Sequence, residues 1–362
     1  MKKTIASILV FLLILCMVPA MAEAAAIETR VVEINKYGQV RLDITETELE
    51  KAGVVLGDIV TVTCGDYTGD MPCFNGYYVD REEVMLRIHP YRDEVTLCVN
   101  YGEFAKLANV GVGDAVTIAM KEKGGALQVQ EVNNLVYSDD RADFASDAIF
   151  ANFRPVAEGK LYRSASPVDN KANRAHYADM LIQEAGVQTV MNMANDAEGI
   201  EAFIAEEGFD SPYYRGLYEA GKVSAEEMVI DFTSSDFAAG IVKGFSFLAG
   251  GETPYLVHCL EGKDRTGFAI MMLEALMGWS EAQIVDDYML TYANYYGIEP
   301  GTDNYDLIVE KNIRPMLNLV TGTEQGTSLT DVGLKAAAEA YLLDNGMDEA
   351  TLKQLEAKLT SE

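Results

Sequence analysis

The sequence predicts an α/β protein, in which a central, mainly parallel sheet is flanked by helices and preceded by a small β-rich domain. From residue 138 onward, short apolar runs with strand character alternate with longer segments whose apolar residues have helical spacing. This alternation is typical of a sheet covered by helices on both faces. Between residues 28 and 136, runs of β-forming residues follow one another instead, which predicts a barrel-like domain. With 362 residues, 49% of them hydrophobic, the chain can bury two cores.

The first 26 residues have the features of a secretory signal peptide. Lys2 and Lys3 precede an apolar run over residues 5–18, and small residues follow, so that cleavage after Ala22 or Ala26 fits. A membrane anchor is the alternative, but it needs a longer apolar run, and no later segment is long enough to span a bilayer. We therefore expect a secreted or extracytoplasmic protein without stable membrane insertion after cleavage.

The β-rich domain, predicted over residues 27–137, contains a faint internal repeat. Residues 56–62 resemble residues 112–118, since in both a Gly-Asp turn leads into a strand and a short helical pattern precedes the turn. Strands are expected over residues 31–34, 40–44, 59–62, 84–88, 95–99 and 115–118, and helices over 46–52 and 103–109. The repeat predicts a small pseudo-symmetric β-barrel that is structural or positions substrate. A second active site is the alternative, but the domain offers one histidine, His89, and no recognisable ligand cluster.

Four cysteines follow the predicted signal peptide: Cys64, Cys73, Cys98 and Cys259. If Cys259 is a nucleophile, at most one disulfide can form among the other three, and Cys64–Cys73 is the easiest pairing. Cys98 lies in an apolar run and is expected in the core. The disulfide state of these three residues stays open.

The second domain, predicted over residues 138–362, begins after a polar joint at residues 138–143. Helices are expected over 170–185, 200–207, 225–249, 280–295, 305–319, 334–343 and 349–359, and strands over 187–193 and 213–217. Ser280 and Gln283 form a capping box. Leu352, Leu355 and Leu359 are spaced for one buried helix face.

Residues 254–267 predict a buried strand, a tight loop and the start of a helix. Cys259 and Arg265 are separated by five residues in this loop. A loop that leads into a helix N-terminus directs backbone N–H groups at one point and adds the positive end of the helix dipole, so it suits an anion. Arg265 can hold two phosphate oxygens, Gly262 allows the bend, and the positive surroundings favour the thiolate of Cys259. The loop therefore predicts thiolate attack on a phosphoryl group.

The string His258-Cys-Leu-Glu-Gly-Lys-Asp-Arg-Thr-Gly267 resembles the signature of the cysteine-dependent protein tyrosine phosphatases, and most closely their bacterial tyrosine, dual-specificity and phosphoinositide branch. Two further stretches resemble this branch: Leu-Tyr-Arg-Ser at residues 161–164, and Ile-Val-Asp-Asp-Tyr at residues 284–288. The resemblance spans residues 152–296. It implies a tyrosine phosphatase-like fold and phosphoric monoester hydrolase activity that needs no cofactor and no metal. The alternatives are a pseudophosphatase and a non-catalytic protein that binds phosphorylated ligands.

The resemblance also assigns roles within the loop. Cys259 attacks phosphorus, while Arg265 and the backbone amides of the loop from Leu260 to Arg265, which includes Glu261, hold the phosphate oxygens. His258 orders the loop rather than acting as a base. The hydroxyl of Thr266 can donate a hydrogen bond to the thiolate. The structural alternative for this residue is that it caps the N-terminus of the helix.

The general acid remains open. Asp264 is the candidate inside the loop, but the neighbouring Arg265 should lower its pKa, which works against an acid. Asp210, Glu219, Asp231 and Asp236 lie upstream and could act from a mobile loop, although no Trp-Pro-Asp marks them, since the only tryptophan is Trp279. Asp196, at the end of a predicted strand, could also face the site, and a turn residue is the alternative for it.

Two substrate classes follow from the loop. The first is phosphotyrosine or dual-specificity protein substrates. The second is inositol phosphates or phosphoinositides, as in a phytase-like enzyme, because Lys263 would add a second cation for multiply phosphorylated ligands; a solvent-exposed loop lysine is the alternative. The formal net charge of −29 makes nucleic acid an unlikely partner and repels anions at long range, so attraction must be local.

Overall fold

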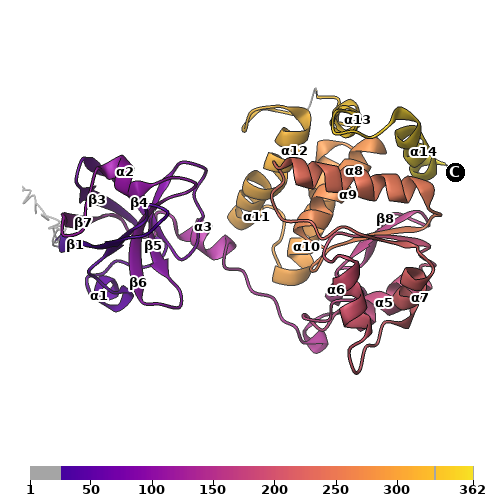
Figure 1. The fold of residues 1–362 in the computed structure, drawn as a ribbon, viewed down its shortest axis with the longest axis horizontal. Helices are drawn as coiled ribbons and strands as arrows, with labels where there is room; N and C mark the ends of the chain where they lie inside the picture. Colours follow the sequence, from indigo (N-terminus) through magenta and orange to yellow (C-terminus); the bar gives the residue numbers. More distant parts are fainter. Residues whose placement is uncertain (1–25, 330–331, 362) are drawn as a thin grey trace, which may run out of the picture. The chain divides into compact units, whose positions relative to one another are not determined.

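The computed structural model describes residues 26–329 and 332–361. The chain divides between Asn133 and Asn134 into two compact units (Figure 1). The predicted signal peptide lies, but for Ala26, outside the described residues. Among the described helices, none has the length and apolar character needed to cross a membrane.

The first unit is a closed barrel of seven strands in the order β1-β2-β6-β5-β4-β3-β7. β1 pairs antiparallel with β7 and closes the barrel, while β4 and β5 run parallel. The elements are β1 (Ile27–Ile34), β2 (Val40–Leu42), α1 (Glu46–Lys51), β3 (Ile59–Cys64), β4 (Tyr67–Phe74), β5 (Val84–His89), β6 (Glu94–Val99), α2 (Phe104–Ala108), β7 (Ala115–Glu122) and α3 (Leu127–Val132).

The predicted repeat is visible in this barrel. β2, α1 and β3 form one copy, β6, α2 and β7 form the other, and the copies meet where β2 pairs with β6 and β3 with β7. The barrel and its two short helices are thus confirmed. β4 was not predicted, because Gly69, Asp70 and Pro72 interrupt its β-forming residues.

The cysteines of the barrel unit are free and buried, so the Cys64–Cys73 pairing is not made. Burial raises the pKa of Cys64 to about 11 and that of Cys73 to about 12. Cys98 is fully buried, as expected. The barrel core therefore holds together by apolar packing of residues such as Val60, Val62 and Leu97.

The second unit is built on a five-stranded sheet in the order β11-β10-β12-β9-β8, in which only the edge strand β8 is antiparallel to its neighbour. Its elements are η1 (Arg141–Asp143), α4 (Asp147–Phe150), β8 (Arg154–Ala157), β9 (Leu161–Ser164), α5 (Ala175–Glu184), β10 (Thr189–Asn192), α6 (Ala197–Ile204), α7 (Pro212–Glu219), β11 (Val223–Ala225), α8 (Ser235–Gly250), β12 (Tyr255–His258), α9 (Asp264–Leu276), α10 (Glu281–Tyr296), α11 (Asp303–Ile308), η2 (Val309–Ile313), α12 (Arg314–Thr321), α13 (Leu334–Asp344) and α14 (Glu349–Thr360).

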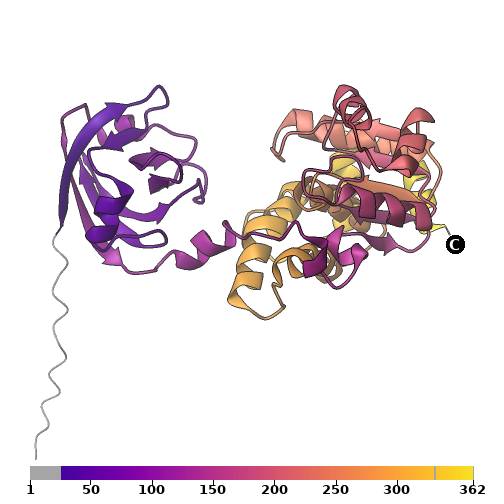
Figure 2. The same ribbon diagram turned by 90° about the horizontal axis from the view of Figure 1, so that it is seen from below.

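Helices cover both faces of this sheet, as the sequence predicts. Figures 1 and 2 show α5, α6 and α7 on one face, and α8 and α9 on the other. Because side chains alternate along a strand, Tyr162, Val190 and Leu256 share the face of α5–α7 and pack into one core cluster. Their neighbour Arg163 consequently points to the opposite face, toward α9 and α10.

Two predicted elements were wrong. Residues 213–217 were expected as a strand but belong to helix α7, because Pro212 stands in its first turn and Tyr214 and Leu217 share its buried side. The helix expected over residues 225–249 begins only at Ser235, capped by the Ser234 hydroxyl. The segment that precedes Ser234 instead lies alongside the end of β10, because the amides of Glu226 and Met228 donate to the carbonyls of Asn192 and Met193.

The capping box of α10 is confirmed, with the Ser280 side chain accepting from the Gln283 amide. Leu352, Leu355 and Leu359 are buried on one face of α14, as predicted.

Candidate active site

The strand–loop–helix predicted over residues 254–267 is present at the centre of the sheet. β12 lies between β10 and β9, and Cys259 follows its last residue at the carboxyl end of the parallel strands. The helix α9 begins at Asp264, earlier than expected. Thr266 is therefore inside the helix and does not cap it, which removes the N-cap alternative for this residue.

The carbonyl oxygens of the loop are bonded on its outer side. The Leu260 carbonyl accepts from the Ser166 amide at 2.9 Å, and the Glu261 carbonyl accepts from the Tyr295 hydroxyl at 2.8 Å. The Gly262 carbonyl accepts from Arg163 Nη2 at 2.8 Å. Among the described residues, no group accepts a hydrogen bond from the amides of residues 260–265. These amides are thus left to bind an anion.

Gly262 makes the bend possible. Its φ is +67°, and a Cβ atom there would lie 2.3 Å from the Ser164 carbonyl oxygen. Only glycine combines this backbone conformation with so close an approach to β9.

Arg265 is fixed by the backbone of two other segments. Its Nη1 donates to the carbonyls of Met193 and Met228, each at 2.9 Å. Its Nε is buried and finds no acceptor among the residues that the structure describes. An unpartnered donor on a guanidinium held by its other end is suited to an oxyanion.

A buried ionic network supports the loop from behind. Arg163 on β9 and Arg154 on β8 both bond the carboxylate of Asp287 on α10, with Arg154 Nε at 2.7 Å from Oδ1. Burial by itself would raise the pKa of Asp287, but Arg163 and Arg154 lower it to about 2. Asn152 adds a bond from its side-chain amide to the Gly262 carbonyl at 3.2 Å. The network therefore holds the carbonyls outward.

Two sequence stretches that resemble the phosphatase family, residues 161–164 and 284–288, supply residues of this network. Arg163 belongs to the Leu-Tyr-Arg-Ser stretch, and Asp287 belongs to the Ile-Val-Asp-Asp-Tyr stretch. Glu274 on α9 lies beside them and is 1% exposed, and burial, with Asp287 nearby, raises its pKa well above its usual range.

His258 is fully buried next to Cys259. Its Nδ1 lies 3.2 Å from the Cys259 carbonyl, and Nε2 has no partner among the described residues. Burial lowers the pKa of His258 to about 4, so the ring is neutral at pH 7. A neutral ring that bonds the adjacent carbonyl suits the expected ordering role.

Cys259 is a free thiol with 3% of its surface exposed. The Thr266 hydroxyl is buried and without a partner in the described part of the chain.

Within residues 26–329 and 332–361, no group of three or more His, Cys, Asp or Glu side chains is arranged to hold a metal ion.

Lys263 is enclosed by its neighbours, so it is not the solvent-exposed loop lysine. Its side chain is 18% exposed, and Nζ lies 3.6 Å from a Glu261 carboxylate oxygen and 3.8 Å from one of Asp264. The ammonium also lies over the rings of Tyr292 and Tyr296. Burial would lower the pKa of Lys263, but Asp264, the two tyrosines and Glu261 outweigh it and raise the pKa.

The pKa of Asp264 is raised overall, although Arg265 acts in the lowering direction expected from the sequence. Burial is the largest cause, and it outweighs the opposing effects of Lys263 and Arg265. The carboxyl group also borders a cavity of about 310 Å³ lined by residues that include Phe232, Lys311 and Asn312.

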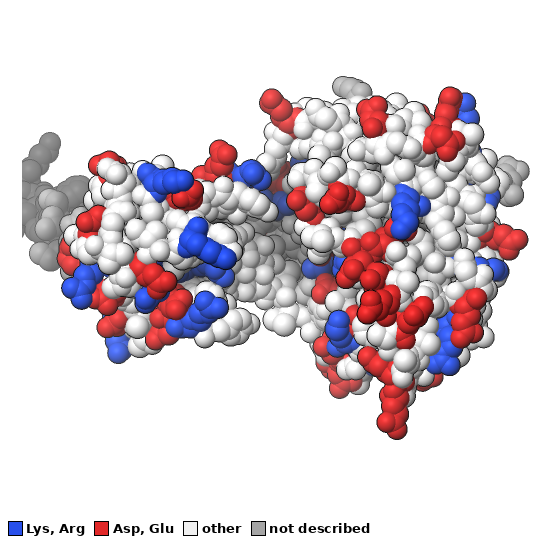
Figure 3. All heavy atoms as spheres, viewed as in Figure 1, with Lys and Arg blue, Asp and Glu red and all other residues white. Residues whose placement is uncertain are grey.

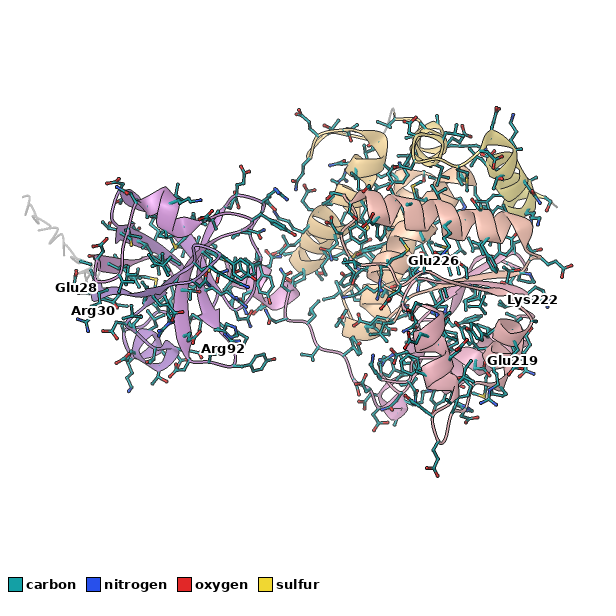
Figure 4. All side chains as sticks on the ribbon, viewed as in Figure 1. Glu28, Arg30, Arg92, Glu219, Lys222 and Glu226 are labelled. Atoms are coloured by element: carbon teal, nitrogen blue, oxygen red, sulfur yellow. The ribbon has the colours of Figure 1, made fainter. Side chains whose placement is uncertain are left out.

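The other candidate acids are mostly engaged elsewhere. Asp196 caps α6 through the Gly199 amide at 2.7 Å, and Asp210 lies 2.8 Å from His176 Nδ1. Asp231 accepts from the Thr233 amide and hydroxyl. Glu219 and Asp236 lie in the last turn of α7 and the first turn of α8. No sequence pattern singles out Glu226, which lies near the sheet in Figure 4; its carboxylate is 2.9 Å from Lys243 Nζ.

A tyrosine that sequence reasoning missed contacts the loop. The Tyr137 hydroxyl donates to the Glu261 carboxylate at 3.0 Å, and its ring packs on Tyr295 with centroids 4.9 Å apart. Arg174 lies over the Tyr137 ring and bonds the carbonyl of Ser138. No local pattern marks Tyr137, because the contact joins residues 124 positions apart.

A family model described as "Tyrosine phosphatase family" matches residues 150–361. Among solved structures, an uncharacterised conserved protein from Thermotoga maritima is 21% identical, with a TM-score of 0.24 over 26% of this chain and 36% of that one. The core catalytic domain of the PP-IP phosphatase SIW14 from S. cerevisiae is 21% identical, with a TM-score of 0.27 over 44% and 85% of the two chains. TpbA from P. aeruginosa, in complex with pTyr, is 17% identical, with a TM-score of 0.31 over 53% and 92%.

Proposed function

The chain belongs to the tyrosine phosphatase family, and from this premise we propose that it hydrolyses phosphotyrosine and related phosphate monoesters through a cysteinyl-phosphate intermediate. The observation that carries the proposal is the set of unpaired donors around the loop. The amides of residues 260–265 and Arg265 Nε have no acceptor among the described residues, while the carbonyls behind them are bonded outward. Such a cradle stabilises the charge that builds on three phosphate oxygens.

The reaction has two steps. In the first, the Cys259 thiolate attacks phosphorus, the S–P bond forms, and the ester P–O bond breaks as the leaving oxygen takes a proton from Asp264. In the second, water attacks phosphorus, the Asp264 carboxylate takes its proton, and the S–P bond breaks to release phosphate and the thiolate. The buried Thr266 hydroxyl, unpartnered among the described residues, is available to donate to that thiolate.

Asp264 suits the acid role better than the other carboxylates. Its pKa is raised by burial, so more of it carries the proton that the leaving group needs. Asp196 and Asp231 already accept hydrogen bonds from their own turns.

The surroundings of Lys263 favour a substrate with one phosphate group. Glu261, Asp264 and two tyrosine rings neutralise or cover its ammonium, so it is poorly placed to hold a second phosphate. This favours phosphotyrosine over inositol hexakisphosphate, which remains the second candidate because the loop has the Gly-Lys-Asp-Arg sequence of the phosphoinositide branch.

The test compares kcat/KM on a phosphotyrosine peptide, a phosphoserine peptide and inositol hexakisphosphate. We expect the phosphotyrosine peptide to be preferred and Cys259→Ser to abolish turnover while phosphate binding remains. If inositol hexakisphosphate is preferred, the second candidate replaces the first. If the wild type binds phosphate but turns over none of the three, the chain is a binding protein.

We further propose export by the signal peptide over residues 1–26. β1 begins at Ile27, directly after Ala26, so cleavage there would leave every strand of the barrel in place. The barrel needs no disulfide, since Cys64, Cys73 and Cys98 are free. Sequencing the N-terminus of the protein recovered outside the cytoplasm tests this, and an intact residue 1 on that material would contradict it.

A further inference from the structure

The barrel unit carries a large open cavity that the phosphatase reaction does not use. Its volume is about 890 Å³, within the range of small-ligand sites. Its wall includes Tyr37, Tyr77 and Tyr101, together with Lys36, Gln39 and the ion pair of Lys106 with Glu103, whose atoms lie 2.6 Å apart. All of these residues belong to the barrel unit, so the cavity is complete within it.

The three tyrosine rings are exposed to an unusual degree for aromatic side chains. The exposed fractions are 61% for Tyr37, 39% for Tyr77 and 74% for Tyr101. Tyr77 is fixed by a hydrogen bond with the side-chain amide of Gln39, which Asn35 holds in turn at 3.0 Å. An exposed ring that is held in place, as Tyr77 is, can contact a ligand at low entropic cost.

The backbone supports the same view at Tyr101. Its φ is +58°, in the left-handed region that bulky side chains rarely adopt. Glycine, asparagine or aspartate would adopt this backbone conformation with less strain, yet the position holds a tyrosine whose side chain is three-quarters exposed. Such strain at an exposed aromatic residue indicates a role other than stability.

Each ring has a cation beside it. Lys36 Nζ lies 4.8 Å from the Tyr37 ring centroid, the Arg81 guanidinium carbon lies 4.5 Å from that of Tyr101, and the Arg87 guanidinium carbon lies 4.9 Å from that of Tyr77. Of these three cations, Lys36 also lines the cavity, while Arg81 and Arg87 lie outside its wall. Lysines and arginines are visible on the barrel unit in Figure 3.

The wall indicates the chemistry of the ligand. A purely apolar ligand would displace water from the Lys36 ammonium, which has no carboxylate partner among the described residues, and would leave this charge without compensation. A small inorganic anion would not use the rings. A sugar acid satisfies both, because one face of its ring consists of C–H groups that stack on tyrosine, while its hydroxyl and carboxylate groups meet the amides and cations.

We propose that the tyrosine-lined cavity of the barrel is a binding site for an acidic oligosaccharide. A single strand of nucleic acid also combines stacking bases with negative charge, but it carries a charge on every nucleotide, and Lys36 is the one ammonium of the wall without a carboxylate partner among the described residues. A glycan that carries one uronate among neutral sugars needs no more than one such cation. The site would attach the phosphatase to an acidic glycan without taking part in the hydrolysis.

Isothermal titration calorimetry of the full chain tests this. The probes are tetragalacturonate and a glucuronate-containing tetrasaccharide, each compared with its methyl-esterified form, and an eight-nucleotide oligothymidylate. Vanadate is present throughout to occupy the catalytic loop. We expect binding of at least one acid form, with its neutral ester bound at least tenfold more weakly.

Two variants show whether the cavity is responsible. Tyr101→Asn keeps a residue that tolerates the left-handed backbone, so the fold should be at least as stable while the affinity falls at least tenfold. Tyr91→Ala is the matched control, since Tyr91 is 91% exposed on the same unit but does not line the cavity, and it should bind within twofold of the wild type. The proposal is overturned if no acid form binds, or if the acid and its ester bind equally. It is also overturned if the chain prefers oligothymidylate, or if Tyr101→Asn binds as the wild type does.

Discussion

At the scale of single residues, burial decides the protonation states around the phosphate cradle. Burial raises the pKa of Asp264 despite the neighbouring Lys263 and Arg265, and it lowers the pKa of His258. The loop thus combines a carboxyl group that keeps its proton more readily with an imidazole that stays neutral. Both assignments lead to measurable pH dependence.

Replacing Asp264 by asparagine should separate substrates by their leaving group. A phenolate such as tyrosine needs a proton as it departs, so we expect the rate on the phosphotyrosine peptide to fall by about 10²-fold or more. The rate on p-nitrophenyl phosphate, whose leaving group departs without a proton, should change by less than about tenfold. Because the carboxyl must be protonated in the first step, the wild-type rate on the peptide should decline as pH rises through its pKa, and this limb should vanish in the variant. Equal losses on both substrates would show that Asp264 is not the acid.

His258 should make stability depend on pH. Its folded pKa of about 4 lies below the unfolded value of about 6.5, so its contribution is full above pH 6.5 and is lost as pH falls toward 4. The difference corresponds to about 3 kcal/mol. Urea denaturation at pH 7.5 and pH 4.5 should show a smaller loss of unfolding free energy for His258→Gln than for the wild type. The same loss in His258→Gln as in the wild type would contradict this assignment.

At the scale of elements, the loop depends on strands and helices that are distant in sequence. β9 supplies Arg163 and the Ser164 carbonyl, α10 supplies Asp287, and the segment after β11 supplies the Met228 carbonyl that fixes Arg265. The position of each is set by strand alternation and by the parallel register, because His258 pairs with Ser164 on one side and Asn192 on the other.

Gly262→Ala should disrupt the cradle. The added Cβ would meet the Ser164 carbonyl oxygen at 2.3 Å, in addition to the strain of a φ of +67°. We expect at least a 10²-fold loss in kcat/KM, with weakened vanadate binding. Gly278→Ala is the matched control, because its φ of +83° imposes similar strain with nothing within 4 Å. It should cost about 1 kcal/mol of stability and little activity, and equal activity loss in the two variants would contradict the role of the β9 contact.

The sequence allowed the central elements to be predicted because their signals are local. β12 and β10 are short apolar runs, and Ser280 with Gln283 marks the start of α10. Residues 213–217, with the sequence Tyr-Tyr-Arg-Gly-Leu, were misassigned because two aromatic residues and a leucine in so short a run fit either a strand or one face of a short helix. The Asp264 pKa and the Tyr137 contact could not be predicted, since both depend on which segments the fold brings around the loop.

At the scale of the whole molecule, charge works against anionic substrates. Carboxylates are spread over the viewed face of the catalytic unit in Figure 3, and the net charge of the chain is −29. Capture of a phosphorylated ligand must therefore depend on short-range contacts within the loop. Added salt screens the repulsion, so kcat/KM should rise modestly with ionic strength before competing anions reduce it.

The boundary between the two units also bears on catalysis. The polar joint suggested that the second domain begins at residue 138, whereas the compact units divide after Asn133. The four residues between these positions include Tyr137, whose hydroxyl bonds Glu261 in the loop and whose ring lies under Arg174. The two boundaries therefore predict different catalytic fragments.

A fragment of residues 134–362 should keep kcat/KM on p-nitrophenyl phosphate within about twofold of the full chain, whereas residues 138–362 should lose about tenfold. The loss follows from the missing hydrogen bond to the Glu261 carboxylate, for which about 1.5 kcal/mol is typical of a charged acceptor. Tyr137→Phe in the full chain should reproduce most of this loss at unchanged thermal stability, which separates positioning of the loop from destabilisation of the fragment. If both fragments are equally active, the Tyr137 contact has no part in ordering the loop; if both are inactive while Tyr137→Phe is normal, the barrel unit itself is needed.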